Sequence, residues 1–124
     1  MGTIGRMQPF VHQAVVDLPP DGDVRGPGGA ITLALCGSWE HPPPCPLAPH
    51  QTDVERSSGE IRLRTVFVCR PEDETQVRQR IAAALTGQAV TGPDGVERTW
   101  SVRGVGPATL RPEERDLAAR LAGG

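Results

Sequence analysis

The chain has 124 residues, enough for one domain with a single core, and its 13 basic and 15 acidic residues give a formal net charge of −2. This near balance excludes a broad positive field, so neither nucleic acid nor a membrane surface is an expected partner. All 13 basic residues are arginine, and lysine, asparagine and tyrosine are absent. Because the codons of those three residues are AT-rich, the bias is typical of a GC-rich bacterial genome and does not indicate phosphate binding.

Export and membrane insertion are not indicated either. The first nine residues contain no apolar segment of a signal peptide, and no run approaches the roughly eighteen apolar residues of a membrane-spanning helix. The three cysteines are an odd number, which argues against a disulfide framework and favours thiol or metal chemistry. We therefore expect a cytoplasmic location.

The first half of the chain reads as strands joined by loops. Alternating apolar residues predict a strand over residues 10–18, and Pro, Gly and Asp residues predict a loop over 19–29. Residues 30–36 place Ile31, Leu33 and Leu35 on one side, which predicts a central strand that ends at Cys36.

The next segment is dominated by proline. Residues 37–52 contain five prolines, which excludes regular structure and predicts a stiff loop, and residues 53–59 have the composition of a charged turn. Residues 60–69 then predict a strand, because their side chains alternate in direction: Ile61, Leu63, Thr65, Phe67 and Cys69 point one way, and Arg62, Arg64, Val66 and Val68 point the other.

The second half predicts two helices and a hairpin. Pro71 and the acidic residues after it are typical of a helix start, and the helix is expected to end at Gly87. The sequence Gly-Pro-Asp-Gly at 92–95 predicts the turn of a hairpin. A C-terminal helix is expected to begin with Thr109 as its N-cap and to stop at the final glycines.

Together these elements predict a single α+β domain over residues 1–124 in the order β-β-β-α-β-β-α. Short connections favour a mostly antiparallel sheet of about five strands with both helices on one face. Residues 1–9 are the expected disordered stretch, and residues 37–52 are the expected proline-rich loop.

Metal-ligand chemistry is concentrated in one segment, which follows the spacing C-x4-H-x3-C-x4-H. Two thiolates and two imidazoles are the ligand set of a tetrahedral structural zinc site. We therefore predict a zinc-type site, or one for another transition metal, with ligands Cys36, His41, Cys45 and His50, and with Cys69 and Glu40 in reserve. Such a protein would be a small metal-binding protein of unknown pathway.

Geometry makes this prediction conditional. If prolines 42–44 adopt polyproline II, the Cα atoms of His41 and Cys45 lie roughly 12 Å apart at about 3.1 Å per residue. Ligands of one metal must approach more closely, because Zn–S and Zn–N bonds measure only about 2.0 to 2.3 Å. A four-ligand site therefore requires a bend at the proline triplet.

Two alternatives of other classes stay open. The proline-rich loop, with Trp39, is suited to docking on a protein partner, which would make the chain an interaction or accessory protein. In the second alternative, Cys36 and Cys45 are the redox-active pair of a thiol redox protein. The only enzymatic scheme the residues offer is Glu40 acting as a general base on metal-bound water, and the familiar phosphate-binding, dinucleotide-binding and hydrolase motifs are absent. We lean towards a non-enzymatic protein.

Three further groups have a functional and a plainer interpretation. Arg62 and Arg64 share a strand face and are suited to cradle a carboxylate or phosphate, although a solvated face paired with nearby glutamates is favoured. Cys69 precedes a helix, an environment that lowers thiol pKa values, although a small buried side chain is favoured. For His12, a core histidine with satisfied hydrogen bonds is favoured over a ligand.

Overall fold

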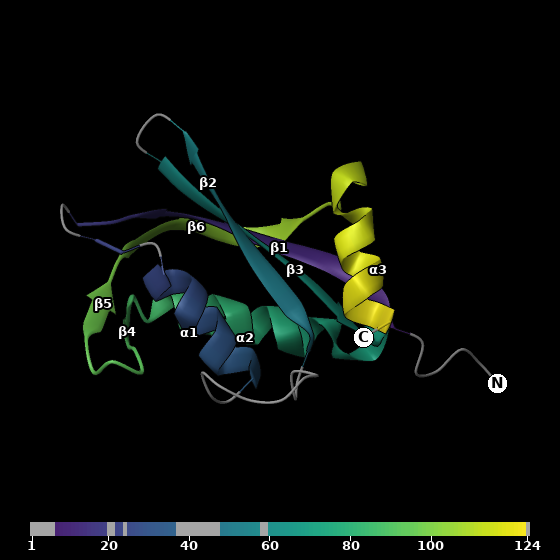
Figure 1. The fold of residues 1–124 in the computed structure, drawn as a ribbon, viewed down its shortest axis with the longest axis horizontal. Coiled ribbons are helices and arrows are strands. Elements are labelled where there is room, and N and C mark those ends of the chain that lie inside the picture. Colours follow the sequence, from purple (N-terminus) through teal and green to yellow (C-terminus); the bar gives the residue numbers. More distant parts are fainter. Residues whose placement is uncertain (1–6, 20–21, 24, 37–47, 58–59, 124) are drawn as a thin grey trace.

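The computed structural model describes residues 7–19, 22–23, 25–36, 48–57 and 60–123, and its elements follow one another as Figure 1 shows. The elements in chain order are β1 (Gln8–Asp17), α1 (Arg25–Cys36), β2 (His50–Ser57), β3 (Glu60–Cys69), α2 (Glu74–Thr86), β4 (Ala89–Thr91), β5 (Glu97–Thr99), β6 (Ser101–Ala108) and α3 (Arg115–Gly123). Short 3-10 turns at Pro71–Asp73 and Pro112–Glu114 lead into α2 and α3. The predicted α+β class is confirmed.

The main sheet has the strand order β2-β3-β1-β6, and all neighbours are antiparallel. Strands β1 and β2 are therefore parallel with β3 between them, and α1 connects them. Strands β3 and β6 are likewise parallel with β1 between them, and α2 lies on their connection. Two interleaved split β-α-β units of this kind form the ferredoxin-like topology. Strands β4 and β5 form a separate hairpin inserted between α2 and β6.

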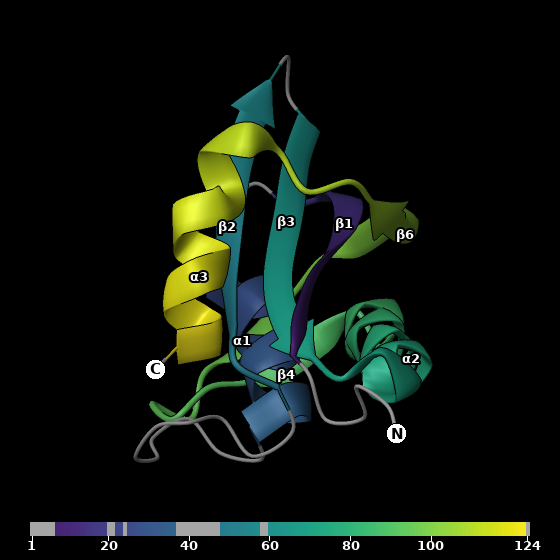
Figure 2. The same cartoon turned by 90° about the vertical axis from the view of Figure 1, so that its right-hand side faces the viewer.

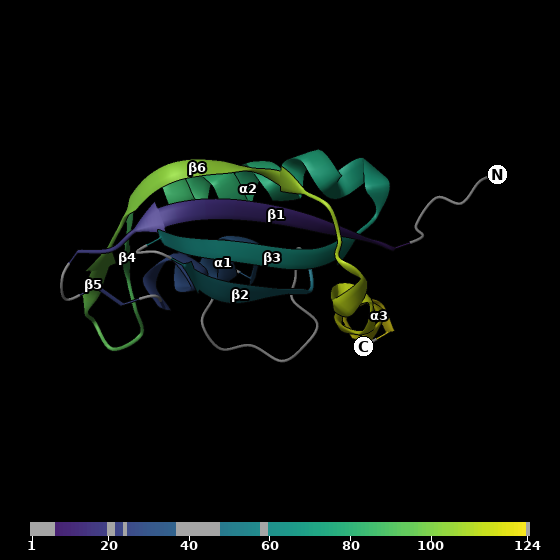
Figure 3. The same ribbon diagram turned by 90° about the horizontal axis from the view of Figure 1, so that it is seen from above.

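Helices cover both faces of the main sheet. One face carries the larger core, in which α1 and α2 pack against β1 and β3 through buried residues that include Ile31, Leu63, Phe67 and Ile81. The other face carries a smaller cluster in which Leu117 and Ala118 of α3 contact Val11 and Val66. Figures 2 and 3 show α3 on the side of the sheet away from α1 and α2. The expected placement of α2 and α3 on one face is therefore wrong.

A buried ion pair attaches α3 to the sheet. Arg64 on β3 donates from Nε to Oε2 of Glu114 at 2.9 Å and from Nη2 to Oε1 at 2.7 Å. The exposed fractions of the two side chains are only 4% and 9%. Oε1 of Glu114 also accepts the backbone N–H of Arg111 at 2.8 Å, which satisfies an N-terminal donor of this turn. Arg111, not the expected Thr109, is thus the N-cap position.

The largest local error concerns residues 30–36, which form the second half of α1 instead of a strand. Ile31 and Leu35 are buried while Leu33 between them is 38% exposed, so the segment has helical and not alternating periodicity. The start of the helix was not recognised in the sequence because Gly26 and Pro27 in its first turn are typical of a loop. Proline is tolerated there because the first-turn N–H groups have no partner within the helix.

Strand β2 occupies residues that were expected to form loop and turn. It pairs with β3 from His50 to Ser57, so both the predicted loop 37–52 and the predicted turn 53–59 overlap a strand. Its charged residues suit an edge strand, where they oppose pairing with another chain. Strand β1 also begins inside the stretch 1–9 that was expected to be disordered. Residues 37–47 of the predicted loop lie outside the described residues.

The strand at 60–69, the helix α2 and the hairpin are confirmed. In the hairpin turn, Gly95 has a φ of 79° and donates its N–H to the Gly92 carbonyl at 3.0 Å, so glycine meets a real conformational need there. The last strand divides into β5 and β6 at Trp100, which is buried and donates from Nε1 to the Leu85 carbonyl at 2.8 Å. None of the described helices is long and apolar enough to cross a membrane.

Candidate functional site

A cleft of about 530 Å³ opens between α1, the edge strand β2 and the β4–β5 hairpin. It lies on the face of the sheet that α1 and α2 cover, to which His50, Thr52 and Val54 of β2 point. Val54 is 39% exposed, so β2 offers apolar surface here that α1 does not cover. The walls are formed by Arg25, Gly28, Gly29 and Thr32 of α1, by His50, Gln51, Thr52 and Val54 of β2, and by Val90, Gly92, Pro93, Asp94 and Arg98 of the hairpin.

The α1 wall of the cleft contains two residues without side chains. Gly28 and Gly29 both line it, and a Cβ atom built at Gly28 would meet no heavy atom within 4 Å. Each glycine inside a helix costs about 1 kcal/mol relative to alanine. Two such residues in succession keep the cleft open at a cost in helix stability.

This cost leads to a stability prediction for two neighbouring glycines. Gly28→Ala is expected to raise the free energy of unfolding by about 0.5 to 1 kcal/mol, because the new methyl group enters open space and helix propensity improves. Gly26→Ala is expected to lower it, because its Cβ would lie 2.9 Å from Cβ of Arg98 and 3.4 Å from the Trp100 ring. Urea denaturation of both variants measures the difference, and equal effects of either sign would contradict the described packing.

A hydroxyl and an imidazole meet at one end of the cleft. Nδ1 of His50 lies 3.2 Å from the Ala48 carbonyl oxygen, and Nε2 lies 3.4 Å from Oγ1 of Thr32. A carbonyl oxygen can only accept, so Nδ1 carries the proton in this bond. In the neutral ring Nε2 then accepts from the Thr32 hydroxyl. The pair offers a ligand both a hydroxyl oxygen and a ring edge of fixed orientation.

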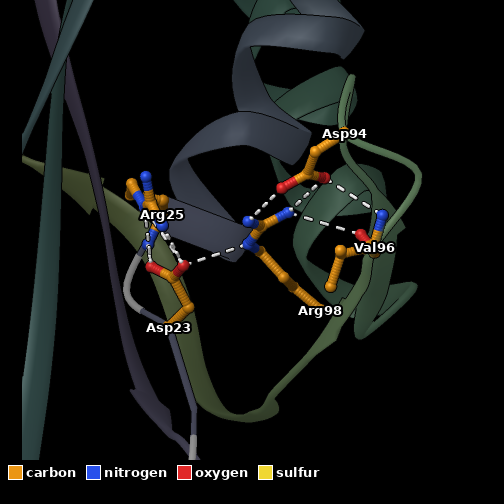
Figure 4. A network of polar contacts seen from close by, with 5 residues as sticks. All are labelled: Asp23, Arg25, Asp94, Val96 and Arg98. Atoms are coloured by element: carbon orange, nitrogen blue, oxygen red, sulfur yellow. Dashed lines mark hydrogen bonds and ion pairs between the residues drawn. The ribbon is translucent and has the colours of Figure 1, made fainter.

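An ionic network closes the opposite end, where the hairpin meets the start of α1 (Figure 4). Arg98 donates from Nε to Asp23 at 3.0 Å and from Nη2 to Asp94 at 2.8 Å. Asp23 also accepts three hydrogen bonds from the Arg25 side chain and one from its backbone N–H. Hydrogen bonds from Arg25 hold the pKa of Asp23 well below its usual range, and those from Arg98 do the same for Asp94. Two cations and two carboxylates therefore cancel, and this end of the cleft is polar without net charge.

The predicted metal ligands are only partly described. His41, Cys45 and the reserve ligand Glu40 lie outside the described residues, as do Trp39 and the loop segment 37–47. The docking surface and the Cys36/Cys45 redox pair predicted there stay predictions. Cys36 is the last residue of α1, and His50 is the first residue of β2 and lines the cleft.

The prediction of a metal-binding protein is corrected by the structure. Across residues 7–19, 22–23, 25–36, 48–57 and 60–123 there is no group of three or more His, Cys, Asp or Glu side chains placed to hold a metal ion. The reserve ligand Cys69 is 2% exposed in the core, and burial raises the pKa of its thiol to about 11, so the metal-binding thiolate form is disfavoured. The favoured interpretation of Cys69 as a small buried side chain is confirmed.

Apart from His50, sequence reasoning did not identify the residues that build the cleft. Thr32 was assigned to a strand and Gly28 to a loop. A usable signal was present, because Ile31 and Leu35 are also spaced as on a helix, and extending that period backwards places the paired glycines on α1.

Comparison of the chain with protein-family models, with curated proteins and with solved structures finds no match.

Proposed function

We propose that the protein binds a small organic molecule in the cleft between α1, β2 and the β4–β5 hairpin. The observation that carries this proposal is the cleft itself, about 530 Å³ in volume, with two consecutive helical glycines in its α1 wall. Sites for small ligands in proteins commonly enclose about 300 to 1,000 Å³ and combine apolar walls with a few fixed polar groups. The cleft has both features.

The lining supports a ligand that is neutral overall and polar at both ends. The Asp and Arg side chains at the hairpin end neutralise one another, so no net charge there attracts an ion. Val54 and Val90 supply apolar surface. Arg25 and Thr32 are seven residues apart on α1, which corresponds to about 10 Å at 1.5 Å per residue. A ligand about that long would contact the Thr32–His50 pair and the ionic network at once.

A substitution that fills the cleft tests the proposal. Gly28→Leu places a side chain where the structure has open space, so the variant is expected to fold and to lose ligand binding. The measurement is a two-dimensional ¹H–¹⁵N NMR screen of a library of neutral fragments. We expect fragments that bind the natural chain to shift the amide signals of Thr32, His50 and Val90. The same fragments should leave the amide signals of Gly28→Leu unchanged.

Gly104→Leu is the matched control. Gly104 lies in β6 and a Cβ atom there also meets nothing within 4 Å, but Gly104 does not line the cleft. This variant should bind every fragment that the natural chain binds. Fragments that bind Gly28→Leu as well as they bind the natural chain would refute the cleft as the binding site.

We also propose a cytoplasmic location. Support comes from Cys69, which is a free buried thiol, and from the odd number of cysteines, since exported proteins usually pair their cysteines.

A further inference from the structure

The β4–β5 hairpin is attached to the rest of the protein by few contacts. Its two strands pair with each other and with no described strand of the main sheet. Of residues 89–99, only Val90 packs an apolar side chain against the larger core, and the middle residue is the only partly covered one in each strand. Segments with so little buried apolar surface open at a smaller free-energy cost than the unfolding of a whole domain. The hairpin also forms one side of the cleft.

Both ends of the hairpin meet at one point, where Gln88 precedes β4 and Trp100 follows β5. The Trp100 N–H donates to the Gln88 carbonyl at 3.1 Å. The Trp100 ring is buried, and its Nε1 donates to the Leu85 carbonyl at 2.8 Å. Because the two ends are joined there and fixed to α2, the hairpin can turn about this point as one unit.

Gln88 has a strained backbone at this point. Its φ is 60°, and in the described part of the chain it is the one non-glycine residue with a positive φ. Such residues persist where surrounding contacts fix them, and they are enriched in switch regions. Here the Gln88 N–H donates to the Leu85 carbonyl at 3.1 Å, and Oε1 accepts the Val102 N–H at 3.0 Å. These contacts hold the base of the hairpin in a conformation that its own backbone disfavours.

One ion pair connects the hairpin to the segment before α1. Arg98 Nε donates to Asp23 Oδ2 at 3.0 Å, and no other ion pair among the described residues joins the hairpin to the rest of the protein. The backbones approach closely beside it, because a Cβ atom built at Gly26 would lie 2.9 Å from Cβ of Arg98. In this structure the hairpin is therefore seated on α1, and the Arg98–Asp23 pair is its latch.

The charges around the latch divide into two neutral pairs when the Arg98–Asp23 contact breaks (Figure 4). Arg98 keeps Asp94, which belongs to the hairpin and accepts from Nη2 at 2.8 Å. Asp23 keeps Arg25 of α1, whose Nη2 donates to it at 2.7 Å. Separation therefore leaves no charge without a partner and avoids the large cost of isolating one. The buried pair that attaches α3 to the sheet differs, because within the described residues neither member has a second ion-pair partner.

We propose that the β4–β5 hairpin is a lid that opens and closes over the cleft, with its hinge at Gln88 and Trp100 and the Arg98–Asp23 pair as its latch. Opening moves the hairpin side of the cleft away from α1 and β2 and widens the path for a ligand. The role in ligand entry rests on the proposed function, whereas the opening motion does not.

The test is ¹⁵N NMR relaxation dispersion without ligand, which measures the population of a minor state that exchanges within microseconds to milliseconds. We expect the amides of Gly26, Val90 and Arg98 to show exchange at one common rate, and the amide of Val66 in the main sheet to show none. Asp23→Asn is expected to raise the open population at least about three-fold, because the latch then lacks its negative charge.

Asp94→Asn is the matched variant, with an expected effect of opposite sign. It keeps the acceptor for the Val96 N–H but removes the carboxylate that stays with Arg98 in the open lid. The open population should fall below that of the natural chain, since Arg98 then has a carboxylate partner only when the lid is closed. Changes of the same sign in both variants would overturn the lid. So would flat dispersion at the hairpin in both the natural chain and Asp23→Asn.

A fragment bound in the cleft separates this proposal from the proposed function. Binding should suppress the exchange at Val90 and Arg98, because an occupied cleft holds the lid closed. Fragments that shift the cleft amides while the exchange persists unchanged would overturn the role of the lid in ligand entry and leave the cleft as a binding site. Exchange at the hairpin without binding of any fragment would refute the proposed function and support the lid.

Discussion

Glu114→Gln is expected to lower the free energy of unfolding by about 3 to 5 kcal/mol. The substitution preserves the shape of the side chain but removes its charge, which leaves the Arg64 guanidinium buried and uncompensated at 4% exposure. In the folded protein, hydrogen bonds from Arg64 hold the pKa of Glu114 below its usual value, so the carboxylate is charged at neutral pH. Chemical denaturation monitored by tryptophan fluorescence gives the change from the midpoint and slope.

Two further variants separate this charge effect from a general loss of contacts. The double variant Arg64→Met/Glu114→Leu is expected to be far more stable than Glu114→Gln, because it removes both charges and leaves neither buried alone. Glu55→Gln breaks the more exposed pair with Arg111 and should change stability less, since the two side chains are 40% and 37% exposed. Equal losses for Glu114→Gln and Glu55→Gln would contradict the assigned role of burial.

The second large effect is a loss of stability in acid that originates at His12. This residue is buried on β1, and Arg78 of α2 donates from Nη1 to its Nδ1 at 2.9 Å. Arginine can only donate, so Nδ1 must be unprotonated in this bond. Burial, and next the positive charge of Arg78, lower the pKa of His12 from 6.5 to about 4. The expectation of a satisfied core histidine is thereby confirmed.

The direction in which the free energy of unfolding changes with pH follows from this lowered pKa. As pH falls, the unfolded chain takes up the His12 proton near pH 6.5, whereas the folded chain resists until about pH 4. The contribution of His12 is therefore fully present above pH 6.5, is lost between 6.5 and 4, and amounts to about 3 kcal/mol.

Measuring the difference in unfolding free energy between the natural chain and His12→Gln as a function of pH isolates this effect. The difference should decrease by that amount across the window and stay constant outside it. A direct titration of the His12 ring signals by NMR supplies an independent value. An apparent pKa near 6.5 in the folded protein would disprove the mechanism, and Arg78→Gln should raise the pKa only in part, because burial is the larger cause.

The parts of the fold that were predicted correctly depend on local patterns. The side chains of β3 point alternately to the two cores, with Leu63 and Phe67 in the larger and Val66 in the smaller. Helix α2 has an acidic start and a glycine after its end, and the hairpin turn contains Pro93 and Gly95 at positions where their conformations are needed. The prediction of a strand at residues 30–36 was wrong because a short apolar run fits a buried strand and a helix equally well. Here the preceding glycines and proline favoured the wrong choice.

The candidate sites were harder to predict because their residues come together only in three dimensions. The cleft takes its walls from α1, β2 and the hairpin, which are separated by tens of residues along the chain. The density of Cys and His residues between 36 and 50 identified ligand types but contained no information on where α1 ends or β2 begins. Arg64 and Arg62 look equivalent in sequence, and only the position of Glu114 beside Arg64 in the folded chain distinguishes them.

The central place of β1 has a consequence for how the protein reaches its native state. Val11 is aligned with Val66 on one side and with Ala108 on the other, so the pairing of the first described strand is completed by the last one. On the ribosome, β1 must wait until residues 101–108 have emerged before both of its edges are covered. Such distant pairings raise the contact order, which slows folding and prolongs exposure of uncovered strand edges. Nascent chains of this protein are therefore expected to rely on chaperones more than those of a helical bundle of equal length.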